Sequence, residues 1–306
     1  MSRTCVAFLS IALSCVWLAG PIVPPVLHAE ESLSIQHSIA AIEPGRFHGW
    51  PANNGVWQWG DEILVGLTQG DFELKRGHNI GGRQDSLLAR SLDGGLTWEM
   101  FDPEGFLDDE NQKFLGGGKI NLQEPMNFRD TGFAMRIFAE GYHGNADPEG
   151  GFFYSPDRGQ TWRGPYALTG LVDHPELSGM RLSPRTDYLV QGDRDCLIFI
   201  SAHEATDPQR QKRIGCVRTT DGGLSFNFVS WVTPNFDAAR AIMSQTIQVA
   251  DREFVCSFRK IASDDELDSI EAYRSQDGCR TWEPLSTVEI MPTHSNPPAL
   301  VKLRDG

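Results

Sequence analysis

Short apolar segments recur along the chain, and clusters of Gly, Asp, Asn and Pro separate them. These segments are rich in β-branched and aromatic residues, which is typical of β-strands that are buried on at least one face. The clearest examples are residues 63–68, 134–139, 196–201 and 254–258. Nowhere does the chain show a helical period of useful length. The pattern therefore predicts an all-β fold.

The expected strands fall into successive groups of similar length. They are 55–59, 63–68, 86–90 and 98–101 in the first group, 134–139 and 152–154 in the second, 186–190, 196–201, 216–219 and 226–229 in the third, and 245–249, 254–258, 270–274 and 282–287 in the fourth. The longer intervals 70–85, 203–213 and 263–268 are expected to be loops, which often carry function. Units of four strands that repeat along a chain are typical of a β-propeller.

One eight-residue pattern, Ser/Thr-x-Asp-x-Gly-x-Thr/Ser-aromatic, follows the third expected strand of each group. Its aspartates are separated by 64, 64 and 56 residues; they are Asp93, Asp157, Asp221 and Asp277. The Asp can accept hydrogen bonds from nearby backbone N–H groups, the Gly permits a positive φ, and the aromatic ring can pack between neighbouring sheets. We expect a structural hairpin at each copy. The fourth carries Cys279 at the glycine position, so its turn should be strained or shaped differently.

This pattern resembles the Asp-box, or bacterial neuraminidase repeat, of the sialidase-like β-propellers, over about residues 40–306. The resemblance implies a six-bladed propeller with the boxes on the rim that faces away from the active site. Residues 30–306 would then hold about four blades, with 296–306 as the first strand and turn of a fifth. We expect this propeller domain to be incomplete at its C-terminal side, which would expose sheet edges.

The charge of the chain limits the classes of partner. A formal net charge of −14 over 306 residues argues against nucleic acid and against an anionic membrane surface. It does not argue against a small anionic sugar, because a local arginine cluster can override the global field. No Cys/His spacing suggests a metal site, and we expect no cofactor. The partner we expect is a carbohydrate, for example a sialic-acid-like or other anionic sugar.

The first 29 residues have the pattern of a secretory signal. Arg3 precedes the apolar run 5–20, which is too short to span a bilayer comfortably, and Leu27-His28-Ala29 is a plausible cleavage site. The sequence thus predicts a secreted or periplasmic protein with no membrane span after signal removal; an uncleaved anchor is the alternative.

Four cysteines would remain in the mature protein: Cys196, Cys216, Cys256 and Cys279. Export could oxidise them, and Cys196 and Cys216 fall on strands expected to be neighbours. We nevertheless expect buried free thiols.

The resemblance to sialidases also implies a set of site residues. In that family three arginines grip the substrate carboxylate, a Tyr assisted by a Glu is the nucleophile, and an Asp is the acid/base. Arg46 matches the first arginine, although the Ile-Pro of the Arg-Ile-Pro motif is altered here, and Arg259 matches the second. The third arginine and the Tyr would lie beyond Gly306. The family Glu falls near 243–244, where the chain has none.

Candidates for the remaining roles lie near the ends of the expected strands. For the acid/base, Asp71 fits by its distance from Arg46, and Asp85 is the alternative. Arg185 begins an inner strand and joins Arg46 and Arg259 as a candidate substrate-binding residue. Further polar candidates flank the same ends; they are His48, Asn53, Asn54, His78, Arg136, Asp187 and Arg240. For the histidines a structural hydrogen bond is the simpler interpretation, and for Trp50, Trp57 and Trp59 it is a place in the core.

These observations favour a secreted sialidase-like glycoside hydrolase, or a truncated remnant of one, that acts on glycans at the mouth of the propeller. The alternative is a non-catalytic propeller that binds a glycan or a protein, because one catalytic residue is replaced and others would lie beyond the chain. A third hypothesis is that the chain does not fold stably.

Overall fold

The structure is a computed structural model that describes residues 35–75, 77–103, 118–140, 147–234, 239–262, 267–291 and 296–303. Residues 37–306 form one compact unit. The expected signal segment 1–29 and most of the expected loop 263–268 lie outside the described residues. All that follows concerns residues 37–306.

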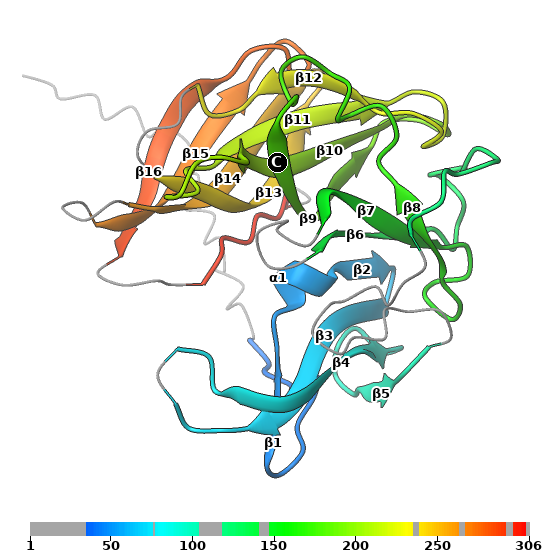
Figure 1. Cartoon of the computed structure of the whole chain (residues 1–306). Coiled ribbons are helices and arrows are strands. Elements are labelled where there is room, and N and C mark those ends of the chain that lie inside the picture. The colour runs from blue at the N-terminus through cyan, green and yellow to red at the C-terminus, as the bar shows by residue number, and fades with distance from the viewer. Residues whose placement is uncertain are drawn as a thin grey trace, which may run out of the picture. The chain divides into compact units, whose positions relative to one another are not determined.

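This unit is built from four antiparallel sheets, which we call blades 1 to 4 (Figure 1). Blade 1 contains β1 (Arg46–Gly49), β2 (Val56–Trp59), β3 (Glu62–Phe72), β4 (Ile80–Ser91) and β5 (Glu99–Phe101), and blade 2 contains β6 (Ala134–Glu140), β7 (Asp147–Ser155) and β8 (Arg163–Ala167). Blade 3 contains β9 (Met180–Val190), β10 (Cys196–Glu204), β11 (Arg213–Thr219) and β12 (Asn227–Trp231). Blade 4 contains β13 (Arg240–Ala250), β14 (Glu253–Ile261), β15 (Asp268–Ser275) and β16 (Glu283–Met291).

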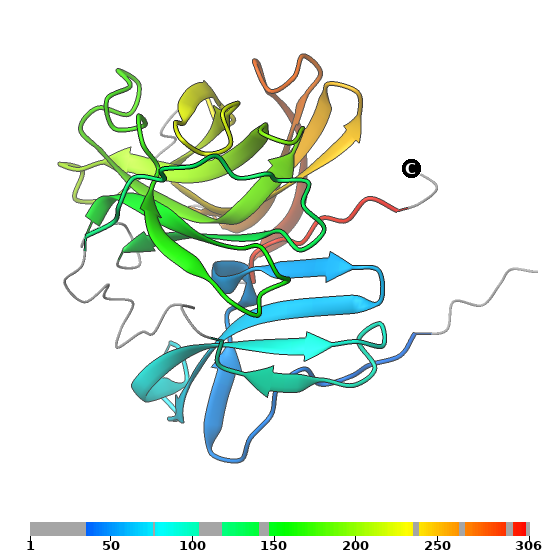
Figure 2. The same ribbon diagram turned by 90° about the vertical axis from the view of Figure 1, so that its right-hand side faces the viewer.

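The blades follow one another as in a propeller. Within each blade, strands that are consecutive in the chain pair side by side, and the inner strand β9 contacts β6 of blade 2 and β13 of blade 4. Figure 2 shows the twisted sheet of blade 1, in blue to cyan, from another side. The prediction of an all-β propeller is confirmed for four blades, because apolar positions repeat in every blade at the period of a strand.

Two expectations about the strands, those for residues 70–85 and 296–306, need correction, and two features of blades 1 and 2 were not predicted. Residues 70–85 are largely strand, since β3 and β4 pair as far as Phe72 with Ile80. The first inner strand is broken into β1 and β2 by a one-turn helix, α1 (Pro51–Asn54). Blade 2 has three strands among its described residues, and residues 118–133 cross outside that sheet, with Ile120 beside Tyr166. Residues 296–303 form no strand, because two consecutive prolines remove backbone donors that a sheet requires.

All four boxes form the same turn between the third and fourth strands. In blade 1, Asp93 Oδ1 accepts from the Thr97 N–H at 2.9 Å, Asp93 Oδ2 accepts from the Thr97 hydroxyl at 2.6 Å, and the Gly95 N–H donates to Ser91 Oγ at 2.8 Å. The corresponding bonds recur in the other three boxes; their aspartates are Asp157, Asp221 and Asp277. Hydrogen bonds from the side chain and backbone of Thr97, then from Ser91, lower the pKa of Asp93 to about 2.

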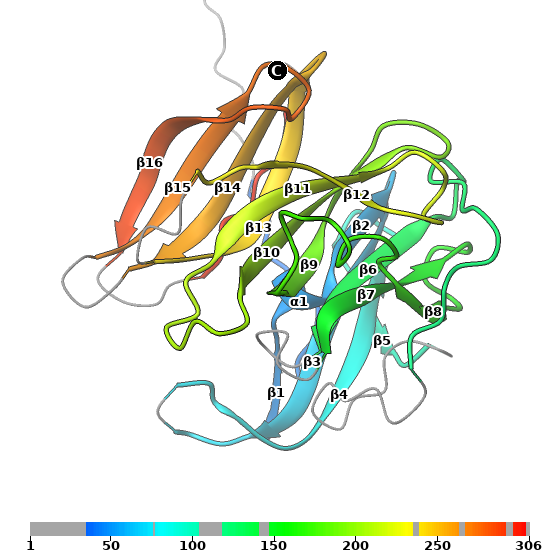
Figure 3. The same cartoon turned by 45° about the horizontal axis from the view of Figure 1, so that its top comes forward.

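The aromatic residue that ends a box packs against the preceding blade. Trp162 is buried with Trp57 of blade 1, Phe226 with Phe152 of blade 2, and Trp282 contacts Phe199 of blade 3. These contacts belong to three apolar clusters, one at each junction between successive blades. The boxes therefore define one end of every blade, and the boxes of blades 2, 3 and 4 also fasten their blade to the preceding one. Figure 3 shows the successive blades from a tilted view.

The four cysteines among the described residues are buried free thiols, as expected. Cys196 and Cys216 lie on the paired strands β10 and β11, but they pack into different clusters on opposite faces of the sheet. Their side chains therefore point apart, which a disulfide does not permit. Cys279 adopts φ +67°, close to the +78° to +90° of the glycines at its position in the other boxes. The fourth turn thus keeps its shape at the cost of a left-handed conformation in a non-glycine residue.

No helix among the described residues has the length and apolar composition that crossing a bilayer requires.

Substitution of two box glycines can distinguish the cost of backbone strain from the cost of a steric clash. Gly159 and Gly95 occupy the same position in boxes two and one, with φ +78° and +90°. A Cβ on Gly159 would lie 2.3 Å from Leu64 Cδ2, whereas one on Gly95 would meet nothing closer than 3.5 Å. Gly95→Ala should lower the unfolding free energy by about 1 kcal/mol and Gly159→Ala by about 3 kcal/mol, measured by urea denaturation. Equal losses would show that the junction of blades 1 and 2 is not packed as described.

Candidate functional site

The ends of the strands opposite the boxes, which we call the mouth end, gather most of the predicted polar residues. Because consecutive strands are antiparallel, this end contains the starts of β9 and β13 and the ends of β3, β10 and β14. The short helix α1 follows β1, which starts at this end, and it contacts β3, β6 and β9 (Figure 1).

Helix α1 exists because the inner strand of blade 1 is broken by residues with unusual backbone conformations. Trp50 is left-handed at φ +61°, Pro51 begins the helix, and Gly55 ends it at φ +101°. Proline is favoured at the first helical position and glycine just after the last. Gly66 of β3 lets the helix approach, because a Cβ there would lie 2.7 Å from Asn54 Cβ. A left-handed tryptophan is uncommon, and such strain is concentrated at functional sites.

Asn54 is fully buried and joins three parts of the structure. Its side-chain N–H group donates to Trp50 O and to Thr68 Oγ1, both at 3.1 Å, and its Oδ1 accepts from Arg136 Nη2 of blade 2 at 2.6 Å. Arg136 is only 2% exposed. A buried guanidinium destabilises the fold unless it is hydrogen-bonded. Asn54 therefore stabilises the buried charge of Arg136 and also holds α1 against β3.

The neighbouring Asn53 holds a second arginine. Its Oδ1 accepts from Arg185 Nε of blade 3 at 2.9 Å, and Arg185 Nη1 donates to Pro184 O at 2.8 Å. Both groups are half-buried. One turn of helix therefore orients two guanidinium groups from two different blades. Such groups are suited to grip a carboxylate.

A further basic cluster adjoins Arg185 at the junction of blades 3 and 4. Lys212 is buried and donates to Ser183 Oγ, and its backbone N–H and C=O bond to Ala239 and Ala241. Burial, followed by the charges of Arg185, Arg240 and Arg210, lowers the pKa of Lys212 from 10.5 to about 6. The amine is therefore mostly neutral at pH 7, and it could take up a proton.

His203 belongs to the same basic cluster. It is 2% exposed, and its Nδ1 has no hydrogen-bond partner among the described residues. Burial, and next the charges of Lys212 and Arg181, lower its pKa from 6.5 to about 4. The imidazole is thus neutral at physiological pH, and the positive charge of this region resides on arginines.

The predicted residues of blade 1 form a separate group near the end of β3. Arg46 makes an ion pair with Asp71, and its Nη2 donates to Gln69 Oε1 at 3.1 Å. His48 shares a hydrogen bond with Gln69 at 2.8 Å, and burial lowers its pKa. Asp85 lies opposite Gln69 on β4 and pairs with Arg83 at 2.7 Å. Both candidate acids, Asp71 and Asp85, therefore stand in ion pairs with neighbouring arginines.

The aromatic residues of the first inner strand divide between two places. Trp57 is buried in the core, and its Nε1 donates to the Tyr188 hydroxyl at 3.2 Å. Trp59 packs against that same core. Trp50 contacts Phe47 and His78, with ring centroids 5.2 and 5.0 Å apart. This aromatic group lies beside α1; Trp50 and Phe47 are half-buried and His78 is exposed.

In blade 4, Arg259 is 8% exposed and lies between Ile242 and Ile270 in the register of the sheet. Next to it Met243 adopts φ +56°, where the register of β13 is irregular. The carboxylate found beside this irregularity is Asp187 of blade 3, whose Oδ1 accepts from the Thr246 N–H at 3.0 Å. Burial raises the pKa of Asp187 to about 6, despite hydrogen bonds from Ser244 and Thr246. Asp187 thus ties blades 3 and 4 at the place where a Glu was expected.

Sequence reasoning missed Ser183, His203 and Lys212. Lys212 follows a polar loop and precedes an apolar strand, a context in which most lysines are exposed. Only the meeting of two blades buries it, and no local pattern signals that. Among the described residues, no group of three or more His, Cys, Asp or Glu is arranged to hold a metal ion.

No protein-family model and no curated protein matches the chain. Among solved structures, the Hadza microbial sialidase Hz136 aligns with a TM-score of 0.51 at 16% identity, over 77% of this chain and 46% of the sialidase. An endo-arabinase from Bacteroides thetaiotaomicron gives 0.47 at 10% identity over 78% of this chain and 80% of its own, and the NanB sialidase of Streptococcus pneumoniae gives 0.44 at 11% over 78% and 51%. The chain is a β-propeller with a sialidase among its structural neighbours, and it spans about half of that sialidase.

The two asparagines of α1 should respond differently to mutation. Asn54→Ala removes a buried acceptor of Arg136 and should lower the unfolding free energy by about 2 kcal/mol. Asn53→Ala changes a half-buried contact and should cost less than about 0.5 kcal/mol, because water can replace Asn53 on Arg185. Chemical denaturation of both variants checks this. Equal losses of unfolding free energy in the two variants would contradict the central role of Asn54 in holding α1.

Because Lys212 is neutral in the folded protein, the unfolding free energy should depend on pH. The folded protein loses this proton near pH 6 and the unfolded chain near pH 10.5, so the unfolding free energy should rise as pH increases between these values. Lys212→Met should lack that part of the rise and be more stable by about 2 kcal/mol at pH 7. Denaturation curves across this pH range test both points. A variant whose profile runs parallel to that of the wild type would show that Lys212 remains charged.

Proposed function

We propose that the chain is a secreted, sialidase-like glycoside hydrolase that acts at its mouth end on glycans with an anionic sugar. The observation that carries this proposal is the set of arginines around α1. Asn53 and Asn54 bond to Arg185 and Arg136 from two blades. Arg185, Arg240 and Arg210 lie close enough to Lys212 to lower its pKa. A chain with a net charge of −14 thus gathers arginines where its blades meet.

The surroundings of these arginines support a sugar as the ligand. The half-buried Trp50 ring beside α1 could stack on a sugar face, and the Asn53 amide could bind a hydroxyl group. The sialidase with the same fold supports the same class of substrate. In this proposal Arg185 binds the anionic group, the buried Arg136 adds positive charge behind α1, and Arg46, Arg259 and His48 border the site. Asp71 or Asp85 would act as the acid.

One observation favours the second candidate function, a propeller that binds such a glycan without cleaving it. Asp71 and Asp85 are each held in an ion pair with an arginine on blade 1. An acid that must donate a proton to a leaving group is ordinarily kept from such a partner, because a neighbouring positive charge favours the ionised carboxylate.

Removal of one arginine at the mouth end should weaken ligand binding, whereas removal of an arginine elsewhere should not. We expect Arg185→Ala to weaken the binding of a sialoside by about tenfold or more, because a hydrogen-bonded charge is lost. Arg129→Ala is the matched control, since Arg129 is exposed and pairs with Asp193 at the box end. Isothermal titration calorimetry with a sialoside and its neutral parent sugar measures both. Unchanged affinity in Arg185→Ala, or equal affinity for the neutral sugar, would contradict the proposal.

A fluorogenic sialoside distinguishes the two functions. Release of the fluorophore by the wild type, and its loss in Asp71→Asn or Asp85→Asn, would identify a hydrolase. Binding without release would identify the non-catalytic glycan-binding propeller.

A further inference from the structure

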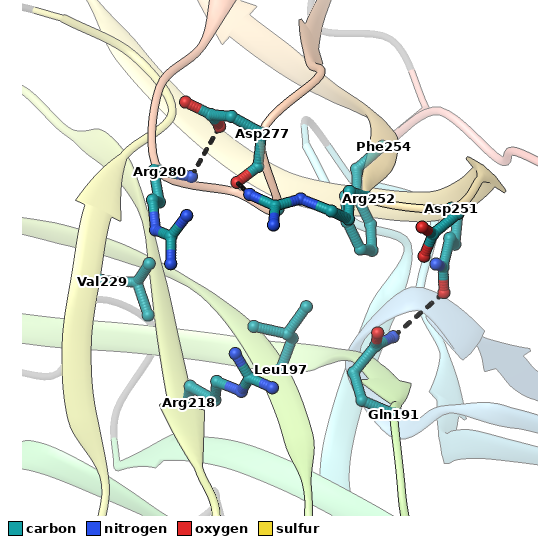
Figure 4. Close-up of a pocket in the computed structure, with 11 residues that line it drawn as sticks. Gln191, Leu197, Arg218, Val229, Asp251, Arg252, Phe254, Asp277 and Arg280 are labelled. Carbon is teal, nitrogen blue, oxygen red and sulfur yellow. Dashed lines mark hydrogen bonds between the residues drawn. The ribbon is translucent and has the colours of Figure 1, made fainter.

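A cavity lies at the box ends of blades 3 and 4, away from the mouth end. Its volume is about 280 Å³, at the lower limit of small-molecule pockets. Figure 4 shows three guanidinium groups that face this space, from Arg218 of β11, Arg252 of the β13–β14 turn and Arg280 of the fourth box. Leu197, Val229 and Phe254 supply apolar contact area.

The equivalent junctions of the other blades show what is unusual here. In blades 1, 3 and 4, an arginine just before the box pairs with a carboxylate at the start of the strand next to the inner one; the pairs are Arg90 with Glu62, Arg218 with Asp195, and Arg274 with Glu253. Each of these pairs lies within a single blade. The junctions between blades therefore differ in which side chains of the next blade lie beside the pair.

At the junction of blades 1 and 2, the group from the next blade is Arg158 of the second box. Its Nη1 donates to Glu62 Oε2 at 2.7 Å, so one carboxylate serves both Arg90 and Arg158. The protein therefore supplies its own anion between two guanidinium groups at this junction.

At the junction of blades 2 and 3, the protein fills the same place with apolar side chains. Leu122 and Met126 of the segment that crosses outside blade 2 pack in one cluster with Tyr154 and Leu224. Leu224 is the sixth residue of the third box, the position that Arg280 occupies in the fourth. The Met126 N–H donates to Gly222 O at 2.8 Å, which holds the segment against the box.

At the junction of blades 3 and 4, neither arrangement is found among the described residues. Arg252 donates through Nη2 to the backbone oxygen of Asp277 at 2.9 Å, and no carboxylate pairs with Arg252 or with Arg280 there. The Asp277 carboxylate is engaged by the hydrogen bonds of its own box. Two guanidinium groups thus converge beside a cavity with apolar contact area.

We infer that this pocket binds a small organic acid of about monosaccharide size. Its carboxylate would lie between Arg252 and Arg280, much as the Glu62 carboxylate lies between Arg90 and Arg158. Arg218, which pairs with Asp195, lies nearby. The carbon skeleton would lie on Leu197, Val229 and Phe254. Gln191 and Gln248, which share a hydrogen bond at 3.2 Å, together with the exposed Asp251, would bind its hydroxyl groups. This site is distinct from the mouth end and does not rest on the function proposed there.

Methyl NMR of the full chain tests this inference, because Leu197 and Val229 report on the pocket alone. The probe is D-glucuronate, with D-glucose as its neutral control and inorganic sulfate as an anion without a carbon skeleton. Glucuronate should shift these methyl signals in the wild type, glucose should not, and sulfate should bind more weakly.

Two substitutions complete the test. Arg280→Leu copies the residue of the third box, and Arg252→Gln keeps a polar side chain of similar length. Each should weaken glucuronate binding by about tenfold or more, while Arg185→Ala at the mouth end should leave it unchanged. Unchanged affinity in both folded variants, no glucuronate shift in the wild type, or equal affinity for sulfate and glucuronate would overturn the assignment.

Discussion

The carboxylate of the box aspartate is the group on which the rest of the structure depends. In every blade it accepts hydrogen bonds from the N–H and the hydroxyl of the residue four positions on, and this closes the turn between the third and fourth strands. The closed turn directs the next aromatic residue toward the preceding blade. Because the same bonds are made in all four blades, the corresponding turn lies at the same end of every blade. Their opposite ends, which carry no such turn, are available for other chemistry.

Positive charge gathers at particular places in the folded unit. The chain is strongly acidic, yet arginines meet where the blades converge, around α1 at one end and beside the fourth box at the other. Within the folded unit most of these arginines have a protein partner: Asn54 for Arg136, Asn53 for Arg185, and Glu62 for both Arg90 and Arg158. Bonds of this kind hold guanidinium groups in fixed positions, which reduces the entropy lost when a ligand replaces water on them.

The fold could be predicted from the sequence because its signals are local. The box sets its own turn, so the position of Asp221 or Asp277 could be inferred without knowledge of any other blade. The site was harder to predict, because α1 depends on contacts between blades. Asn53 and Asn54 are adjacent in sequence, but the arginines they hold are 132 and 82 residues away. Lys212 and the Arg252–Arg280 pocket exist only where two blades meet, and no periodicity within one blade reveals them.

The central claim is that the mouth end recognises an anionic glycan through arginines held by α1. A crystal structure of the protein soaked with N-acetylneuraminic acid tests it most directly. The account predicts a sugar beside α1, with its carboxylate within hydrogen-bonding distance of the Arg185 guanidinium and its ring near Trp50. Crystals that bind the sugar only at the box end, or a mouth end that binds none when the sugar is saturating, would contradict it.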